Sequence, residues 1–299
     1  MKPMLKTRLA LAAAPVLLGL ILPGAAMAHR PWMLPSSTVL SGDDSWVTID
    51  AAVSNDLFYF DHQPMRLDNV KVVAPDGSDV AIENGSTGRY RSVFDVHLTK
   101  PGTYKIVSAT VGLMGSYKLN GEEKRLPRGT TAATLAQAVP AGATDVQTAE
   151  FSNRNEVFVT LGEPTTGALQ ITGKGLEMLP VTHPNDLISG ESATFQFLLD
   201  GKPAADLAVT VIPGGVRYRD AVGEIDAKTD AQGKATVTWP NPGMYWMNAS
   251  IGGGREGGGG PSGPGAGGPG AGNGEGPPRP MGPPQRRAGY VTTLEVLAP

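Results

Sequence analysis

Apolar and polar residues alternate along short segments through much of this chain. Residues 47–51 alternate apolar with polar positions, and residues 235–239 do the same with threonine at the polar positions. Alternation with a period of two is typical of β-strands that bury one face. Pro-Gly and Asp-Gly pairs between such segments mark turns. Helical periodicity is scarce, and the best helix candidate is a short alanine-rich segment at 131–138. The pattern therefore predicts an all-β fold.

Part of this pattern occurs twice. Met-Leu-Pro stands at 33–35 and again at 178–180, and each copy is followed by a Ser-Gly pair. An alternating strand comes next, beginning at Val47 in the first copy and at Phe195 in the second. Both copies then pass through a Pro- and Gly-containing turn and reach a Pro-Gly-x-Tyr sequence. Four matches in the same order indicate an internal duplication.

The duplication predicts two tandem immunoglobulin-like β-sandwich domains, at 29–168 and 169–299. In such domains a tyrosine at a corner donates a hydrogen bond to the backbone a few residues upstream. Tyr104 and Tyr245 stand at matching positions beside the Pro-Gly pairs, so we expect a tyrosine corner in each domain. Each domain also has a long excursion before its last strand, which covers 112–150 in the first domain.

In the second domain the excursion is rich in glycine and proline, at residues 252–287. A segment of this composition cannot bury enough apolar surface to offset the entropy lost on ordering it. It lacks the strict three-residue period of collagen, and it contains no histidine. We therefore predict a long disordered loop.

The first copy carries about ten more residues than the second between its Ser-Gly pair and its next turn. These extra residues fall near 55–65, which is an aromatic and acidic stretch that includes His62. Functional groups often sit on loops held by a rigid scaffold, which favours a functional insertion. The alternative is a hydrophobic flap that covers an open edge of the sandwich.

Residues 1–28 have the pattern of a secretory signal peptide. A basic start precedes an apolar stretch that ends in Ala26-Met27-Ala28, a small-x-small sequence of the kind that signal peptidase cleaves. Cleavage after Ala28 would leave His29 as the new N-terminus, whereas cleavage after Ala26 would not. No other run of 18 or more apolar residues occurs. We expect a periplasmic protein whose mature chain has no membrane span.

A histidine at a free N-terminus can bind a metal ion through both its α-amine and its ring. We therefore take His29 as the first candidate ligand, with His62 or His97 as a further one. Strand alternation places Asp95 and His97 together on the outer face of the first domain. A carboxylate there, or Asp61 in the insertion, would complete or orient the site. The alternatives are a histidine left by chance and a solvated strand face.

The amino-acid composition limits which partners and which metal ligands this chain can have. The formal net charge is −3, without a basic segment that would suit nucleic acid. There are no cysteines, which leaves 4 histidines, the N-terminal amine and 10 methionines as borderline or soft ligands. Amine and imidazole nitrogens suit nickel, copper or zinc, and Met33 and Met65 could add thioethers, although methionine usually serves packing.

His183 is either a turn residue or an interdomain group. No catalytic motif of the common hydrolase, kinase or metalloprotease kinds occurs, so we do not expect an enzyme.

Several segments together resemble the NikM-like periplasmic proteins. The segments are His-Arg-Pro-Trp-Met-Leu-Pro at 29–35, Gly-Lys-Gly-Leu-Glu-Met-Leu-Pro at 173–180, Thr-His-Pro-Asn-Asp at 182–186, Leu-Asp-Gly-Lys-Pro at 199–203, Thr-Asp-Ala-Gln-Gly at 229–233 and Pro-Gly-Met-Tyr-Trp at 242–246. The resemblance covers nearly the whole mature chain and implies an association with nickel or cobalt uptake. It also implies a transmembrane region, which this sequence does not show.

These observations lead to one main hypothesis and two alternatives. The main one is a periplasmic accessory protein that binds a divalent transition metal and passes it to a membrane transporter or an outer-membrane receptor. The first alternative is a structural or interaction module of the cell envelope, since the fold alone does not decide function. The second is a copper enzyme that cleaves polysaccharides, for which only the ligand type matches.

The site of signal cleavage is the first point to test. We expect the exported protein to begin at His29, because the small-x-small sequence ends at Ala28. The intact mass of the exported protein reports this directly. A mass corresponding to a start at Met27 would remove the N-terminal amine from His29.

Overall fold

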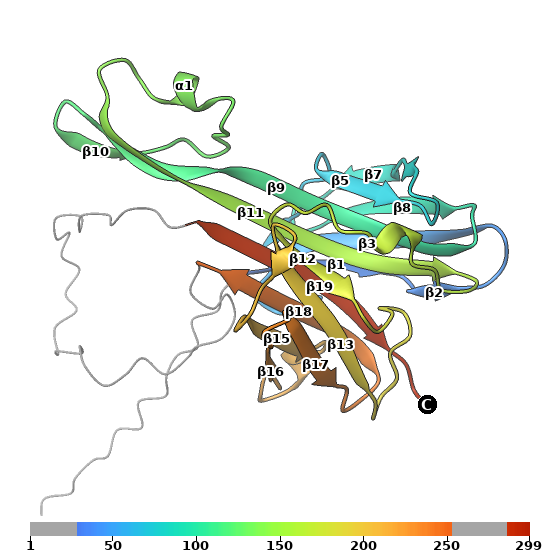
Figure 1. Ribbon diagram of the computed structural model, residues 1–299. Helices are drawn as coiled ribbons and strands as arrows, with labels where there is room; N and C mark the ends of the chain where they lie inside the picture. Colours follow the sequence, from blue (N-terminus) through green and yellow to red (C-terminus); the bar gives the residue numbers. More distant parts are fainter. Residues whose placement is uncertain (1–28, 253–285) are drawn as a thin grey trace, which may run out of the picture.

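The computed structural model describes residues 29–252 and 286–299, and the predicted signal peptide and nearly all of the predicted disordered loop lie outside them. The described residues form an all-β protein of two β-sandwiches, as the sequence predicts (Figure 1). A large central sheet runs through both sandwiches, and a smaller sheet covers each of its halves.

The first sandwich packs one smaller sheet against one half of the central sheet. The smaller sheet has the order β1-β3-β8-β7, with β4 beside β3. Its core contains Ile49 and Phe94 from this sheet and Ile106 and Val159 from the central sheet. The strands of this sandwich are β1 (Arg30–Pro35), β2 (Val39–Leu40), β3 (Ser45–Ser54), β4 (Gln63–Pro64), β5 (Val70–Val73), β6 (Asp79–Val80), β7 (Glu83–Thr87), β8 (Ser92–Leu98), β9 (Gly102–Leu119), β10 (Glu122–Arg125) and β11 (Thr144–Leu161).

The second sandwich has the same construction. Its smaller sheet has the order β12-β13-β14, with β17 also beside β13, and it packs against the other half of the central sheet. The 3-10 helix η1 (Gly167–Leu169) lies between the two sandwiches in the sequence, and η2 (Val216–Tyr218) follows β15. The strands are β12 (Leu176–Pro180), β13 (Ser192–Leu199), β14 (Lys202–Pro203), β15 (Ala208–Pro213), β16 (Ile225–Lys228), β17 (Lys234–Thr238), β18 (Gly243–Ile251) and β19 (Arg287–Val296).

Strand pairing supports the duplication that the sequence suggests. The antiparallel pairs β1–β3, β3–β8, β5–β9 and β9–β11 correspond to β12–β13, β13–β17, β15–β18 and β18–β19. The pairing of β1 with β3 and of β12 with β13 corrects the alignment of the two copies by two residues. Pro35 pairs with Ile49 and Pro180 with Phe195, so Ile49 rather than Val47 is the equivalent of Phe195. Because side chains alternate with a period of two, this shift leaves every residue on the expected face.

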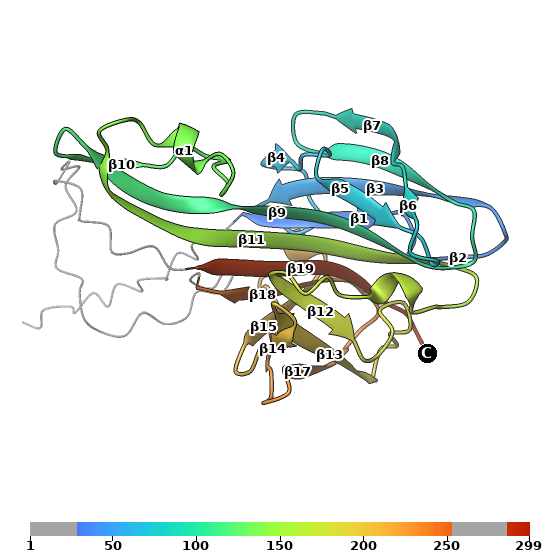
Figure 2. The ribbon, with the colours of Figure 1, turned by 45° about the horizontal axis from the view of Figure 1, so that its top comes forward.

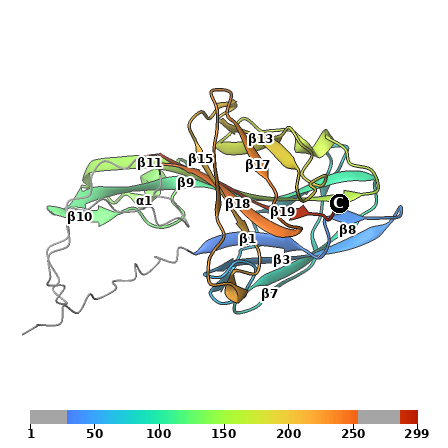
Figure 3. The same ribbon diagram turned by 90° about the horizontal axis from the view of Figure 1, so that it is seen from below.

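The two halves of the central sheet are joined by a parallel pair of strands. The last strand of the first sandwich, β11, pairs with the last strand of the second, β19, from Phe151↔Arg287 to Val157↔Thr293. Two antiparallel sandwiches thereby share one continuous sheet. The smaller sheets lie on opposite faces of it, with β3 and β8 on one side and β13 and β17 on the other (Figures 2 and 3).

A third apolar cluster seals this junction. Trp32 of β1 and Ala52 of β3 pack against Ile212, Trp246 and Val291 of the second sandwich, together with Leu57 of the insertion. The Trp246 indole also donates a hydrogen bond to the Pro31 carbonyl, at 2.9 Å. Trp246 thus faces the first sandwich, while its neighbours Tyr245 and Met247 face the core of the second.

Both predicted tyrosine corners are present. The Tyr104 hydroxyl donates to the carbonyl of Lys100 at 3.0 Å, and the Tyr245 hydroxyl donates to the carbonyl of Asn241 at 2.7 Å. Both tyrosines are buried. The equal four-residue spacing in the two sandwiches is further evidence for the duplication.

The excursion of the first sandwich is a long hairpin. β9 and β11 continue together well past the covering sheet, and β10 adds to the edge of β9 near the tip (Figure 1). The predicted helix is confirmed but shorter, as α1 (Leu135–Ala138). It begins after Thr134, because Thr131 and Thr134 form a hydrogen-bonded turn ahead of it.

The tyrosine corners give a stability prediction. Tyr104→Phe leaves the Lys100 carbonyl and amide without the hydroxyl, so we expect unfolding to cost about 0.5–1.5 kcal/mol less. Urea unfolding of the mature chain measures this. Tyr218→Phe is the matched control, because Tyr218 is 82% exposed and should shift stability by less than about 0.5 kcal/mol. Equal effects of the two variants would contradict the role of the corner.

Candidate metal centre

Two of the predicted ligands, His29 and His62, lie against each other. Their rings stack with centroids 3.7 Å apart and planes 3° from parallel. The backbone explains the contact, since both residues flank the end of β3. Arg30 pairs with Ser54, and Gln63 pairs with the preceding Val53. The N-terminal strand and the end of the insertion therefore lie on either side of one strand.

Hydrogen bonds fix the loop that returns to His62. The Asp61 carboxylate accepts the backbone N–H groups of Asn55 at 2.9 Å and of Asp56 at 3.3 Å. The Arg30 guanidinium donates to the Asn55 carbonyl, at 2.9 Å. Asp61, a predicted ligand, is thus engaged in closing the loop. Its carboxylate positions the neighbouring histidine through the backbone.

The aromatic part of the insertion acts as a hydrophobic cover. Phe58 and Phe60 pack around Trp32 with ring centroids 5.6 Å away in each case. The guanidinium of Arg91 lies 4.3 Å from the centre of the Phe60 ring, and that of Arg217 lies 4.1 Å from the centre of the Tyr59 ring. The flap interpretation therefore describes this part of the insertion, which the two sandwiches hold from both sides.

The predicted pair of Asp95 and His97 shares the outer face of β8, since the residues between and beside them are buried. The structure places this pair away from His29 and His62. His97 pairs with Trp46, which is eight residues from Ser54 along β3, or roughly 26 Å at about 3.3 Å per residue. His97 instead stacks on Trp46 and contacts the Asp44 carboxylate at 2.5 Å.

Asp95 is held by hydroxyl and amide donors. Thr48 donates to one carboxylate oxygen at 2.6 Å and Asn84 to the other at 2.8 Å. Both hydrogen bonds keep the pKa of Asp95 below its usual value, and the one from Thr48 has the larger effect. A carboxylate engaged in this way stabilises the strand face, and its two donors come from β3 and β7.

Within residues 29–252 and 286–299, no three side chains of histidine, cysteine, aspartate or glutamate gather closely enough to hold a metal. The contact of His29 with His62 brings two imidazole rings together, each with nitrogens of the kind that transition metals bind. The α-amine that cleavage after Ala28 would create is a backbone group, and it would be the third nitrogen at the same place.

His183 joins the two sandwiches while forming a turn. Its Nδ1 accepts the backbone N–H of Asn185 at 3.2 Å, so the neutral tautomer carries its hydrogen on Nε2. Nε2 lies 3.2 Å from the carbonyl of Thr165 and 3.0 Å from the hydroxyl of Thr103 in β9. Burial lowers the pKa of His183.

A buried charged network is a feature that the sequence reasoning missed. Arg154 lies between two buried carboxylates, 3.0 Å from Glu156 and 3.2 Å from Glu177. Glu156 also accepts the hydroxyl of Tyr290 at 2.9 Å. Burial, followed by the Glu156 charge, raises the pKa of Tyr290 well above its usual value. Since these residues come from β11, β12 and β19, the network ties the two sandwiches together.

The Gly-Lys-Gly segment at 173–175 belongs to a loop that wraps around the Glu177 carboxylate. The carboxylate accepts the backbone N–H groups of Thr172, Gly173 and Lys174, at 2.7–3.2 Å. Successive N–H groups of this kind form an anion-binding concavity, which here holds the protein's own carboxylate. An acidic residue two positions after Gly-Lys-Gly was the available signal.

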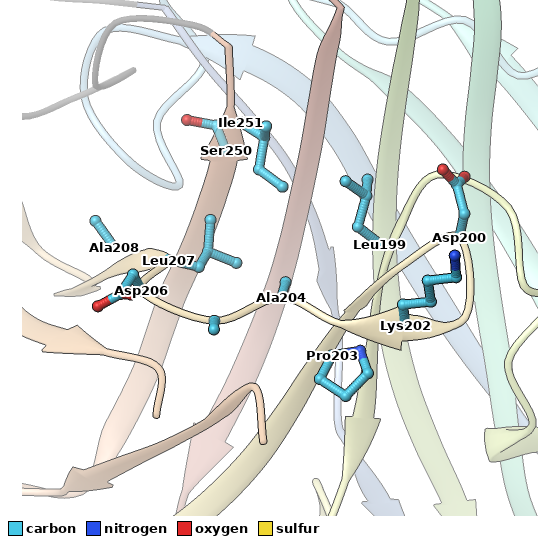
Figure 4. Close-up of a pocket in the computed structure, with 11 residues that line it drawn as sticks. Leu199, Asp200, Lys202, Pro203, Ala204, Asp206, Leu207, Ala208, Ser250 and Ile251 are labelled. Carbon is cyan, nitrogen blue, oxygen red and sulfur yellow. The ribbon is translucent and has the colours of Figure 1, made fainter. Parts of the chain in front are cut away.

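The depression shown in Figure 4 lies at an edge of the second sandwich and has a volume of about 600 Å³. Its two carboxylates are already paired. Asp206 lies 2.7 Å from Lys228, and Asp200 lies 2.5 Å from Arg286. Hydrogen bonds from Arg286 are the main reason that the pKa of Asp200 falls to about 2. This depression offers no converging set of reactive groups.

Comparison with protein families matches residues 26–253 to a domain of unknown function, DUF4198. The chain belongs to this family. The matched range includes His29, the insertion and every strand up to β18, and it ends before β19. Family membership fits the resemblance to an uncharacterised family, while the nickel or cobalt association stays a prediction. Comparison with curated proteins finds no match.

Solved structures with some similarity include domains of intimin and a pullulanase. The D0-D1 domain of intimin is 15% identical over 73% of this chain and 88% of its own, with a TM-score of 0.18. The D00-D0 domain of intimin is 12% identical over 74% and 91%, with a TM-score of 0.18. The Group B Streptococcus pullulanase SAP is 11% identical over 73% and 22%, with a TM-score of 0.16. At these TM-scores the likenesses add nothing to the strand pairing described above.

The contacts of His183 predict a pH dependence of stability. Its folded pKa lies below its unfolded pKa of about 6.5, so the unfolded chain takes up the proton first as pH falls. The free energy of unfolding should therefore fall between pH 7 and pH 5, and less so in His183→Gln. Urea unfolding at a series of pH values measures this. An unchanged slope in His183→Gln would contradict the prediction.

Proposed function

We propose that this chain is a periplasmic accessory protein that binds a divalent transition metal ion through His29 and His62. The 3.7 Å stacking of the two rings carries the proposal. The sequence separates these residues by 33 positions, and the fold brings them together at the only place where a new N-terminal amine is expected. The ion is cargo that passes to a membrane transporter or an outer-membrane receptor.

Three nitrogens would form the site. The amine and the ring of His29 close a chelate, and the His62 ring adds the third ligand. Metal–imidazole bonds measure about 2.0–2.1 Å, so the nitrogens of two rings on one ion lie roughly 3–4 Å apart, from neighbouring to opposite positions, a range that includes the present spacing of the rings. The rings must turn from the stacked arrangement to point at one ion. His29 is exposed at the chain end, which leaves its side chain room to do so.

The ligand set favours particular ions. Nitrogen ligands in a planar arrangement suit copper(II) and nickel(II), and affinities rise from cobalt through nickel to copper. Three protein ligands leave positions open on the ion, and an open position lets a receiving protein add its own ligand before release. An ion with open coordination positions is better suited to transfer between proteins than to storage. The resemblance to NikM-like proteins favours nickel or cobalt as the physiological cargo.

The cellular place of the protein follows from its first residues. The signal pattern of residues 1–28 favours export to the periplasm. No helix within residues 29–252 and 286–299 has the length and apolarity to cross a membrane.

Metal titration tests the proposal. Calorimetry of the chain beginning at His29 with nickel, cobalt, copper and zinc should give one ion per chain for at least one of these metals. His29→Ala and His62→Ala should each weaken binding by at least about 10–100-fold, the loss known for the outer-shell partners of metal ligands. A chain beginning at Ala28 should weaken it similarly, because its amine lies one residue away from His29.

His97→Ala is the matched control: His97 of β8 lies beside Trp46, at the far end of β3 from the site, so its loss should leave binding unchanged. Equal affinities in the wild type and His29→Ala, or no binding of any of the four ions, would overturn the proposal. In that case the structural or interaction module becomes the better hypothesis.

A further inference from the structure

A cleft of about 310 Å³ opens where the smaller sheet of the first sandwich ends and the central sheet continues. One wall comes from the beginning of β1, the end of β3 and the segment around β4. The floor comes from β9, β11, β19 and β18, which lie side by side across the junction of the sandwiches (Figure 1). Pro31 and Gln63 line it, so it lies close along the chain to both His29 and His62.

Asparagine and hydroxyl side chains form the floor. Ser108 pairs across the strands with Asn155, Asn155 with Val291, and Val291 with Asn248. In the next row Thr110 pairs with Asn153. Since residues that pair across strands point to the same face, these side chains all line the cleft.

The Asn153 amide lies over a glycine in this second row. A Cβ on Gly289 would come within 2.9 Å of the Asn153 Oδ1 atom. The glycine thus gives the amide room to lie flat on the floor.

Asn155 is the feature that calls for a ligand. It is only 5% exposed, and its Oδ1 atom has no hydrogen-bond partner. Its Nδ2 atom contacts the Met65 sulfur at 3.7 Å, and a thioether is a weak acceptor. A buried amide oxygen without a partner costs free energy, and native structures rarely keep one without a reason. This oxygen is sealed from solvent in the present side-chain position, so a turn of the Asn155 amide toward the cleft would let it bind a group that offers a donor and an acceptor together.

The other lining residues narrow the class of ligand. Among the described residues of the cleft, none is acidic, which argues against a metal cation. None of them is aromatic, so a sugar ring or a nucleobase would find no stacking surface. Arg66 at the cleft is paired with Asp68, and the Arg154 side chain is paired with Glu156 on the opposite face of the sheet, which argues against a highly charged anion.

We propose that this cleft binds a short, extended, uncharged peptide segment through the side-chain amides of Asn153 and Asn155. A peptide group offers one N–H donor for the unpartnered Asn155 Oδ1 atom, and one carbonyl that is a stronger acceptor for Nδ2 than the Met65 thioether. Asn153 and Asn155 are two positions apart on β11, or roughly 6.6–6.8 Å. The two-residue repeat of an extended peptide has the same length, so both amides can bind alternate residues of one segment.

The remaining lining fits a peptide as well. Pro31, Pro64 and Val53 provide apolar contacts for small side chains on the wall. The volume of the cleft equals that of roughly ten water molecules at about 30 Å³ each, which limits the ligand to two or three small residues. The site needs no metal, so its test is independent of the function proposed above.

The test is a titration followed by NMR, with the ¹⁵N-labelled mature chain in EDTA and N-acetyl-trialanine amide as the probe. We expect saturable shifts at the side-chain amides of Asn153 and Asn155 and at the backbone amides of Val53 and Gln63. Asn155→Leu should weaken binding by about tenfold or more, because the bidentate amide pair is lost. Gln196→Leu, on the second sandwich, is the control and should bind as the wild type does.

Thermal unfolding of the same variants separates binding from folding. Asn155→Leu removes a buried polar group without a full set of partners, so its melting temperature should equal or exceed that of the wild type. Maltotriose serves as a carbohydrate probe in parallel. No shift with millimolar peptide, equal binding by Asn155→Leu, or shifts with maltotriose alone would overturn the proposal.

Discussion

The parallel pairing of β11 with β19 is the constraint on which the rest of the structure depends. Two sandwiches joined only by a linker would be free to move against each other. Here their sheets are continuous, and backbone hydrogen bonds fix the relative position of the halves. The Trp32–Trp246 cluster covers one face of the seam, and the Arg154 network lies on the other. Apolar packing and buried charge thus stabilise the same joint from two sides.

Much of the fold could be predicted from the sequence, because period-two alternation and a duplicated pattern carry it. The tyrosine corners and the outer-face position of Asp95 and His97 follow from the same reasoning. The β11–β19 seam could not be predicted, since pairing between two strand edges leaves no periodic signal in either strand. The capping role of Asp61 was missed for a related reason: its partners are backbone N–H groups, which every residue carries.

The candidate site was predicted in part. The contact of His29 with His62 depends on the insertion returning beside β3, which the extra length of the first copy suggested but could not specify. His97 looked equally suitable as a ligand in the sequence, and only the register of β3 with β8 separates it from the pair. The amide cleft had no sequence signal, because its floor is assembled from four strands that lie far apart along the chain.

The seam also sets the order in which this protein can complete its fold. Its partner strands lie near the middle and at the end of the chain, and Trp32 packs against residues more than 200 positions away. Contacts over such separations form late, because loop closure costs entropy before they stabilise anything. Until β19 is added, β11 is an open strand edge beside an exposed tryptophan, a combination that invites aggregation. The chain therefore reaches its protected state only once β19 (Arg287–Val296) has paired with β11, so this one strand completes the whole assembly.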